Sequence, residues 1–277
     1  MKVMIGTMVK NSAMFLPSYF NLLRSLTYPK NNIRIVFIYG NSSDRTLEII
    51  KEEEAKGDLD ICIYSEQNDQ NLRVGGAQLA ASAYNDFQNA MKEDEDYFLL
   101  LDSDIKGAPS NLIEELIAVN ADIVAPYPWS EEHRHFYDNW IFRINNIRFS
   151  PTHPPGEGLK YPIIVDSVGT CFLAKSHVFK GVQIVNPYPN LQFCNKAREM
   201  NYMVIACPYL EIIHIDIEKL DPPIIHNPLP QEYGFYPKNG FLDSSNYQPR
   251  RFIPISKELI KEQEKDFMNN IMRGECK

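Results

Sequence analysis

Three aspartate pairs, each with one residue between its members, are the residues of this sequence best suited to bind an ion. They stand at positions 58 and 60, 94 and 96, and 102 and 104. Two carboxylates so spaced in a turn can converge on a hard cation such as Mn²⁺ or Mg²⁺, which then bridges the oxygens of a diphosphate. Because the chain has a net charge of −8, such a cation would also offset repulsion between protein and diphosphate.

Position along the chain separates the third pair from the other two. The pairs at 58/60 and 94/96 precede strand-like runs, whereas Asp102 and Asp104 follow the apolar run 97–101. In open α/β sheets, ligands bind beyond the carboxyl ends of the strands. Asp102 and Asp104 are therefore the candidate metal ligands, and Ser103 between them is a candidate contact to the bound substrate. The alternative interpretation is a solvated turn in which Asp104 caps a helix.

Alternating strand and helix patterns provide the frame for this pair. Continuous apolar runs predict strands at 3–8, 33–39, 61–64, 97–101 and 122–125. Apolar residues at helical spacing predict helices at 15–26, 47–50, 74–91 and 111–119. Apolar strands separated by helices predict a mostly parallel sheet covered on both faces, an α/β fold. After Pro126 the pattern loosens, with strand-like pieces at 163–165, 171–174 and 210–215, a helix near 191–200 and a terminal helix at 256–272.

The composition excludes several classes of protein. With 277 residues and 44% apolar composition, one large domain is expected. The acidic balance argues against a nucleic-acid partner. Five cysteines, odd in number and without a C-x-x-C pair, favour a reducing compartment over a disulfide framework. The N-terminus reads as a strand, with no signal peptide or transmembrane segment, so a soluble, cytoplasmic protein is predicted.

Short motifs in a fixed order resemble those of a known class of enzymes. The segments 41–46 (Asn-Ser-Ser-Asp-Arg-Thr), 71–77 (Asn-Leu-Arg-Val-Gly-Gly-Ala) and 101–104 (Leu-Asp-Ser-Asp) resemble the nucleotide-binding half of GT-A glycosyltransferases. The segments 165–175, 193–198 and 213–216 are similar to the fungal mannan-synthesising α-mannosyltransferase family and, more distantly, to family 2-like glycosyltransferases. The resemblance spans residues 1–216.

This resemblance implies a domain organisation. Residues 1–220 would form a GT-A, Rossmann-like domain, with a nucleotide-binding half at 1–105 and an acceptor half at 106–220. The resemblance does not cover residues 221–277; there the proline density and the helical spacing of apolar residues predict a proline-rich tail and a terminal helix packed on that domain. Whether the tail docks peripherally on a membrane stays open, as does the oligomeric state.

The resemblance also implies roles for individual residues. Asp102 and Asp104 would be the metal aspartates, with Asp104 counted as catalytic, and His214 the third protein ligand; imidazole suits Mn²⁺ better than Ca²⁺. Taken alone, a histidine near a strand end is more often structural. By its position, Arg73 opens the helix of Gly75 and Gly76 and could place its guanidinium on the phosphates or the nucleobase; the alternative is a surface arginine at a helix start. The remaining candidate nucleotide contacts are assigned from position alone, at the end of and beyond the first two strands, and they are Thr7, Val9, Asn11 and Asn41.

Two departures from the family pattern bear on the mechanism. Acidic pairs that many inverting relatives carry are missing at Tyr39-Gly40 and just before Phe193. The second absence leaves 189–192 without a carboxylate to deprotonate an acceptor hydroxyl, which favours retention of the sugar's configuration. Asp166 is then the best remaining carboxylate for binding sugar hydroxyls and is counted as catalytic; a turn aspartate is the alternative.

The aromatic and polar cluster from Trp129 to Trp140 has two interpretations. Its rings could stack on sugar faces, or the loop could fold over and cover the core. A metal site at His133 and His135 is a weaker alternative, since no further ligand stands at convincing spacing.

Three hypotheses about function follow. The first is a retaining transferase that uses Mn²⁺ (or Mg²⁺) and a nucleotide sugar, with GDP-mannose the preferred donor, and acts on a glycan or glycolipid hydroxyl. The second is an inverting UDP-sugar transferase whose base is among Asp138, Asp166 and Asp216. The third is a sugar-nucleotide-binding protein that has lost catalysis.

Overall fold

The structure, a computed structural model, describes most of the chain up to residue 215. The described residues are 1–65, 76–130, 136–138, 141–144, 147–148, 160–184, 189–215, 233–234 and 250–251, with only the backbone described at 76–81, 147–148, 233–234 and 250–251. The predictions made for Arg73, His133, His135, Trp140, Asp216 and the helix at 256–272 lie outside these residues.

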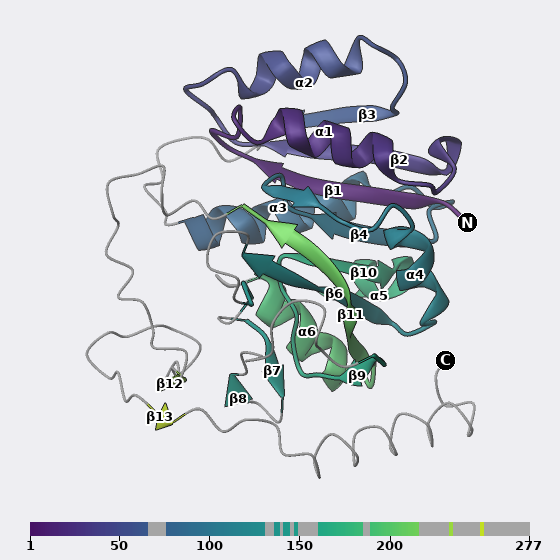
Figure 1. Ribbon diagram of the computed structural model, residues 1–277, viewed down its shortest axis with the longest axis vertical. Helices are drawn as coiled ribbons and strands as arrows, with labels where there is room; N and C mark the ends of the chain where they lie inside the picture. The colour runs from purple at the N-terminus through teal and green to yellow at the C-terminus, as the bar shows by residue number, and fades with distance from the viewer. Residues whose placement is uncertain are drawn as a thin grey trace.

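A nine-stranded sheet forms the centre of the molecule (Figure 1). The strands along its main path follow the order β3-β2-β1-β4-β10-β6-β11-β5, and β9 pairs with β11 beside it. Strands β1, β2, β3, β4, β6 and β11 run parallel, and β5, β9 and β10 run antiparallel to their neighbours. Their bounds are β1 Val3–Val9, β2 Ile33–Tyr39, β3 Ile61–Ser65, β4 Tyr97–Leu101, β5 Ile105–Gly107, β6 Ile123–Ser130, β9 Ile163–Ile164, β10 Cys171–Lys175 and β11 Val204–His214. The prediction of a mostly parallel α/β sheet is confirmed.

Helices cover both faces of this sheet. They are α1 Leu16–Ser25, α2 Thr46–Glu54, α3 Gly76–Ala90, α4 Leu112–Ala118, α5 Ser176–Gly181 and α6 Pro189–Glu199, with a short 3₁₀ helix at Lys30–Asn32. Two short antiparallel pairs among the described residues lie off the sheet: β7 Arg143–Ile144 with β8 Ile147–Arg148, and β12 Tyr233–Gly234 with β13 Arg250–Arg251.

Alternation along the strands builds two cores, one on each face. In β4, Phe98 and Leu100 enter the core beneath α3, α5 and α6, whereas Leu99 and Leu101 enter the core beneath α1, α2 and α4. All four residues are fully buried. Because both faces of the strand are apolar, the sheet needs helices on both sides, as Figure 1 shows.

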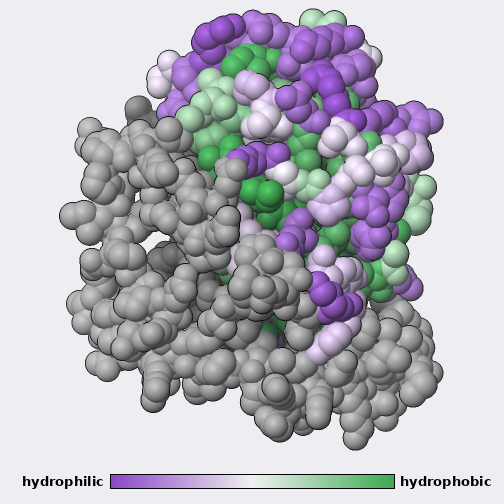
Figure 2. Space-filling model, viewed as in Figure 1, coloured by the Kyte–Doolittle hydropathy of each residue, from purple (hydrophilic) through white to green (hydrophobic). Residues whose placement is uncertain are grey.

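The exposed surface around α2 is hydrophilic. In the space-filling view (Figure 2), hydrophilic residues gather over the top of the molecule, where α2 lies at the outer rim. This helix buries Thr46 and Ile50 and exposes most of its charged side chains. Within the described residues, no helix is long and apolar enough to cross a membrane.

Two strands run further than their sequence patterns predict. Strand β6 continues through Pro126 and Pro128 to Ser130, although the pattern was expected to loosen at Pro126. Strand β10 pairs with β6 only at Ile123 and Val124. Beyond them β6 pairs continuously only with β11 among the described strands, with an isolated bridge to Phe136 at Trp129, and prolines are tolerated where a strand has no continuous partner on one side. The predicted strand at 210–215 likewise begins earlier, at Val204.

Candidate active site at the carboxyl edge of the sheet

The turn that carries Asp102 and Asp104 joins β4 to β5. The amide of Ile105 donates to the carbonyl of Asp102 over 3.1 Å, which closes the turn. A strand, not a helix, follows Asp104, so the alternative interpretation of Asp104 as a helix cap is wrong. Both aspartates stand at the carboxyl end of a central parallel strand, where α/β sheets place their ligands.

Strand pairing brings His214 to this turn from more than one hundred residues away. β5 pairs antiparallel with β11, and His214 is the partner of Ile105. The amide of Ile215 donates to the carbonyl of Asp104 over 2.9 Å, and Nε2 of His214 lies 3.0 Å from Oδ1 of Asp104. The side chains of His214 and Asp104 are 2% and 16% exposed, so the contact is largely shielded from water.

The acidic and imidazole groups of this turn perturb one another. Burial, followed by the neighbouring charge of Asp104, raises the pKa of Asp102 well above its usual range. Burial disfavours a charged His214, but the contact and charge of Asp104, with the charges of Asp102 and Asp138, outweigh it and raise the pKa of His214. A positive charge is therefore favoured where these carboxylates meet.

Two buried atoms at the same place fit a cation. Nδ1 of His214 is buried without a hydrogen-bond partner among the described residues, and the buried Oδ1 of Asp104 faces Nε2 of the same imidazole. Carboxylate oxygens and imidazole nitrogen together suit Mn²⁺, so the residues present fit such an ion chemically. In the described part of the chain, however, no three His, Cys, Asp or Glu side chains are gathered closely enough to form a ligand shell.

Asp166 lies in the loop before β10 and is held by a cation of the protein. Its Oδ1 lies 2.6 Å from Nη2 of Arg198 on α6, and its amide donates to the carbonyl of Arg143 over 2.7 Å. The Asp166 side chain is 10% exposed. A carboxylate held in this way can still accept hydrogen bonds, so this geometry suits orienting a hydroxyl.

The loops after β1 and β2 are fastened to each other. Asn11, with a φ of 51°, accepts from the amide of Ser43 over 2.8 Å, and its own amide donates to Oγ of Ser42 over 3.1 Å. Asp44 accepts from the amides of Ala13 and Thr46 over 3.0 Å each. These bonds fix the two loops as one rigid surface beside the Asp102 turn, to which Ser103 Oγ adds a 3.4 Å contact with Ser12.

The other predicted nucleotide contacts differ in how they are placed. Asn41 is exposed on the second loop. Thr7 and Val9 lie inside β1, which extends to Val9, and are 0% and 3% exposed. The hydroxyl of Thr7 contacts that of Tyr19 in the core, so its burial favours a packing role. Ser103, 7% exposed, lies between the two aspartates in the turn.

Part of the aromatic cluster covers the core. Trp129 and Phe136 are 3% and 0% exposed and pair through an isolated bridge, and their rings meet edge to face at 6.2 Å. Tyr137 instead stacks on His214, with ring centroids 3.5 Å apart and an interplanar angle of 16°. Asp138 accepts from the amide of Thr170 over 3.0 Å. The sequence grouped these residues but did not show that Tyr137 reaches His214.

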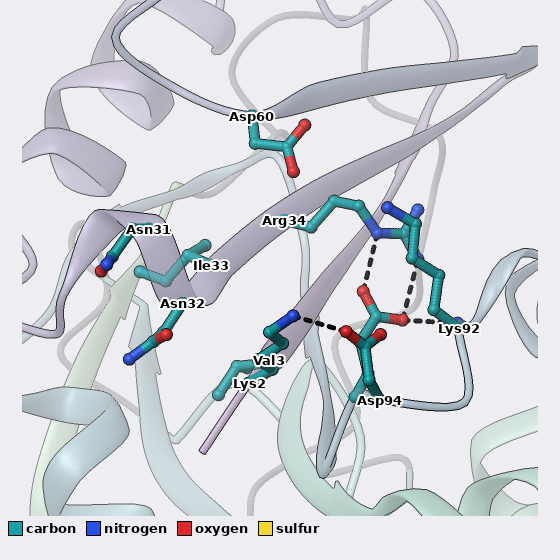
Figure 3. A pocket seen from close by; sticks show the side chains of 10 residues that line it. Lys2, Val3, Asn31, Asn32, Ile33, Arg34, Asp60, Lys92 and Asp94 are labelled. Atoms are coloured by element: carbon teal, nitrogen blue, oxygen red, sulfur yellow. Dashed lines mark hydrogen bonds and ion pairs between the residues drawn. The ribbon is translucent and has the colours of Figure 1, made fainter.

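A hollow lies at the opposite edge of the sheet. It is lined by the starts of β1 and β2 and by the turn before β4 (Figure 3). Lys2 points toward Asp94 there, and Arg34 is paired with the buried Glu95. Charges of both signs neutralise one another, and the hollow is far from the carboxyl ends where Asp102 stands.

Comparison with known proteins places the chain in a family. Residues 1–147, more than half of the chain, match the family model described as glycosyltransferase family 25, N-terminal domain. The chain belongs to this family. The resemblance to mannan-synthesising enzymes is also confirmed: the ANP1 subunit of mannan polymerase II from Saccharomyces cerevisiae is 26% identical over 150 residues, which cover 46% of this chain and 30% of that protein.

A relative that carries the family name matches more of the chain. A glycosyltransferase 25 family member from Anopheles gambiae is 26% identical over 207 residues, which cover 68% of this chain and 34% of that protein. The chain spans only about a third or less of the length of these curated relatives.

Solved structures share the GT-A fold at low identity. S. aureus TarS in complex with UDP-GlcNAc has a TM-score of 0.55 at 15% identity, covering 78% of this chain and 59% of that one. The mannosyltransferase PcManGT from Pyrobaculum calidifontis, in complex with GDP-Man and Mn²⁺, has a TM-score of 0.53 at 13% identity, covering 77% and 56%. The predicted GT-A architecture is confirmed.

Proposed function

We propose that the protein transfers a sugar from a nucleotide-diphosphate sugar, with GDP-mannose the preferred donor, to a hydroxyl of a glycan or glycolipid. The observation that carries this proposal is the turn of Asp102 and Asp104 at the end of β4, with His214 brought against it by strand pairing. Family membership and the GDP-Man complex of a structural neighbour support the donor class.

Asp102, Asp104 and His214 would hold a divalent cation, Mn²⁺ or Mg²⁺. A cation bound there neutralises the charge of the departing diphosphate. Two neighbours were solved with Mn²⁺. The contact of Asp104 with His214, whose Nδ1 is buried without a hydrogen-bond partner among the described residues, supports the same set. Because the described side chains do not form a ligand shell, we expect ion binding to include their rearrangement.

The fastened loops would receive the nucleotide. Asn11 and Asn41 lie on the surface formed by the loops after β1 and β2, near the base and ribose in this proposal, with Arg73 assigned to the phosphates. Ser103 would contact the donor from within the aspartate turn. Thr7 and Val9 would support this surface from inside β1 and would not touch the ligand directly, since both are buried.

The placement of the acidic residues supports retention. Asp138 is 7% exposed and bonded to Thr170, and Asp166 is paired with Arg198, so neither is placed as a free base among the described residues. Asp166 would orient donor-sugar or acceptor hydroxyls. The second candidate is inversion with a UDP-sugar, favoured by the UDP-GlcNAc complex of TarS. A β-linked product from an α-linked donor, read from its anomeric NMR signals, would end the retaining proposal.

A donor panel tests the proposed function. Calorimetry would measure the binding of GDP-, UDP- and ADP-sugars with Mn²⁺ and again with EDTA. We expect metal-dependent binding of one nucleotide class, strongest for GDP-mannose. No metal-dependent binding of any donor would contradict the proposal and favour a binding or scaffold protein that lacks catalysis. Binding without product formation from any acceptor glycan would point the same way.

Replacement of one ligand gives a sharper test. Asp104→Ala removes a carboxylate and leaves the diphosphate charge uncompensated, so donor binding in Mn²⁺ should be lost. Asp60→Ala is the matched control, because Asp60 belongs to another aspartate pair and is exposed at the opposite edge. Equal donor affinity in the two variants would count against the assignment.

We also propose a cytoplasmic location. The described cysteines Cys62, Cys171, Cys194 and Cys207 are free thiols, as expected for a reducing compartment. Cell fractionation with a tagged full-length chain would test it, and recovery from an oxidising compartment would refute it.

A further inference from the structure

Residues 136–138 contact two parts of the candidate site at once. They lie against the end of β6: Phe136 forms an antiparallel bridge with Trp129, and the amide of Tyr137 donates to the carbonyl of Pro128 over 2.8 Å. The segment is therefore fixed to the strand next to β11, the strand that ends at His214. The next two side chains, those of Tyr137 and Asp138, make different contacts.

Tyr137 determines how the imidazole of His214 is oriented. The rings lie 3.5 Å apart and within 16° of parallel, so the phenol covers one face of the imidazole. A ring covered in this way cannot rotate about its own side chain without breaking the stack. The imidazole edge thus stays directed at Asp104, 3.0 Å away.

Asp138 anchors the same segment on the other side. Its carboxylate accepts from the amide and the hydroxyl of Thr170, and its carbonyl accepts from the amides of Ile141 and Phe142 over 3.1 and 3.0 Å. At Gly169 an added Cβ would lie 2.9 Å from both carboxylate oxygens, so the backbone there approaches Asp138 as closely as only glycine allows. The anchor leaves Tyr137 little freedom to move away from His214.

We infer that Tyr137 is a positioning residue for His214, held in place by Asp138, and that it sets the affinity of this site for Mn²⁺. The inference rests on the proposed function, since it presumes that His214 is a metal ligand. Groups that orient a metal ligand without touching the metal commonly change metal affinity by about 10- to 100-fold when they are replaced. A planar ring stacked on imidazole is such a group, although it acts by contact and not by a hydrogen bond.

Binding of Mn²⁺ alone, followed by the electron paramagnetic resonance signal of the free ion, tests the inference without any turnover. Tyr137→Leu removes the flat ring and should weaken Mn²⁺ binding about tenfold. Tyr137→Phe keeps the ring and should restore affinity to within about twofold of the wild type. Tyr137→Met, which fills the space without a planar ring, should behave like the leucine variant and serves if that variant does not fold.

Two controls separate positioning from general loosening. Phe136→Leu shortens the neighbouring core ring, which packs on Tyr127 and Trp129, and should lower the unfolding temperature while leaving Mn²⁺ affinity unchanged. In a His214→Ala background, Tyr137→Leu should have no further effect on Mn²⁺ binding, because the group it positions is gone.

The outcomes separate a failure of this inference from a failure of the proposed metal-dependent function. If the wild type binds no Mn²⁺, the proposed metal site fails and the inference fails with it. If the wild type binds Mn²⁺ and His214→Ala weakens it, but Tyr137→Leu does not, only the inference is overturned. Equal losses from Tyr137→Leu with and without His214 would also overturn it, since the tyrosine would then act on another group.

Discussion

Replacement of Glu95 by glutamine should destabilise the fold strongly without touching the candidate site. Glu95 and Arg34 form a buried ion pair, with side chains 3% and 5% exposed and nitrogen–oxygen distances of 2.7 and 2.8 Å. Oε2 of Glu95 also accepts from the amide of Lys92 over 2.7 Å. Glu95→Gln leaves the Arg34 cation buried opposite a neutral amide.

The size of the effect follows from that uncompensated charge. Breaking a buried pair by removing one partner costs about 3–5 kcal/mol, a large share of the roughly 5–15 kcal/mol by which domains are stable. With a urea dependence of about 3 kcal/mol per molar, the unfolding midpoint should fall by about 1–1.7 M. Urea titration followed by circular dichroism measures it.

Two further variants decide whether the reasoning holds. Arg34→Met combined with Glu95→Gln removes both charges and should recover part of the lost stability, because no buried ion is left alone. Asp94→Asn, which breaks the exposed pair with Lys2 at the rim of the same hollow (Figure 3), should leave the midpoint unchanged. A midpoint for Glu95→Gln equal to that of the wild type, or a double variant weaker than the single one, would refute the reasoning.

Three other predictions concern separate parts of the chain. Gly6→Ala places a Cβ 2.5 Å from the ring of Phe98, so overpacking should cost about 1–3 kcal/mol in the same urea titration, and an unchanged midpoint would contradict it. Burial raises the pKa of Cys194 and Cys207 to about 12, so a disulfide reagent at mildly alkaline pH should label them only after unfolding; rapid labelling of the native protein would be inconsistent with this. For Asp44, burial raises the pKa, but the hydrogen bonds from Thr46 and Ala13 outweigh burial and lower the pKa overall. The stability that these bonds contribute is therefore present above the unfolded pKa of about 3.9 and is lost as pH falls through the folded pKa. The loss of stability caused by Asp44→Asn at neutral pH should shrink in strong acid, and a loss that does not change with pH would refute this prediction.

The sequence was enough to predict the parallel core of the fold but not the placement of every strand. Apolar runs such as 97–101 identify buried strands because both faces of the sheet are covered. The insertion of β10 antiparallel between β4 and β6 depends on contacts between segments far apart in the chain, which no local pattern encodes. The three-residue strand β5 is too short to show any periodicity.

The same limits apply to the candidate site. Asp102 and Asp104 could be selected because a strand's carboxyl end is visible in the sequence. The approach of His214 to Asp104 depends on the pairing of β5 with β11, and only the family resemblance suggested it. The ion pair of Asp166 with Arg198 and the stack of Tyr137 on His214 join residues with no spacing pattern, so neither could be predicted.

The irregular pairing of β11 with β6 determines which residue of β11 reaches the carboxyl edge of the sheet. Cys207 pairs with Pro126 and Glu211 with Tyr127, so residues 208–210 have no counterpart in β6. Their number decides which side chain arrives opposite Ser130, the place that His214 now takes. Deleting one of them would bring Ile215 there, and adding one would bring Ile213. In homologous sequences, insertions and deletions should therefore be far rarer in this three-residue stretch than in the loops of the rest of the sheet. A single insertion or deletion here would replace the imidazole by an aliphatic side chain.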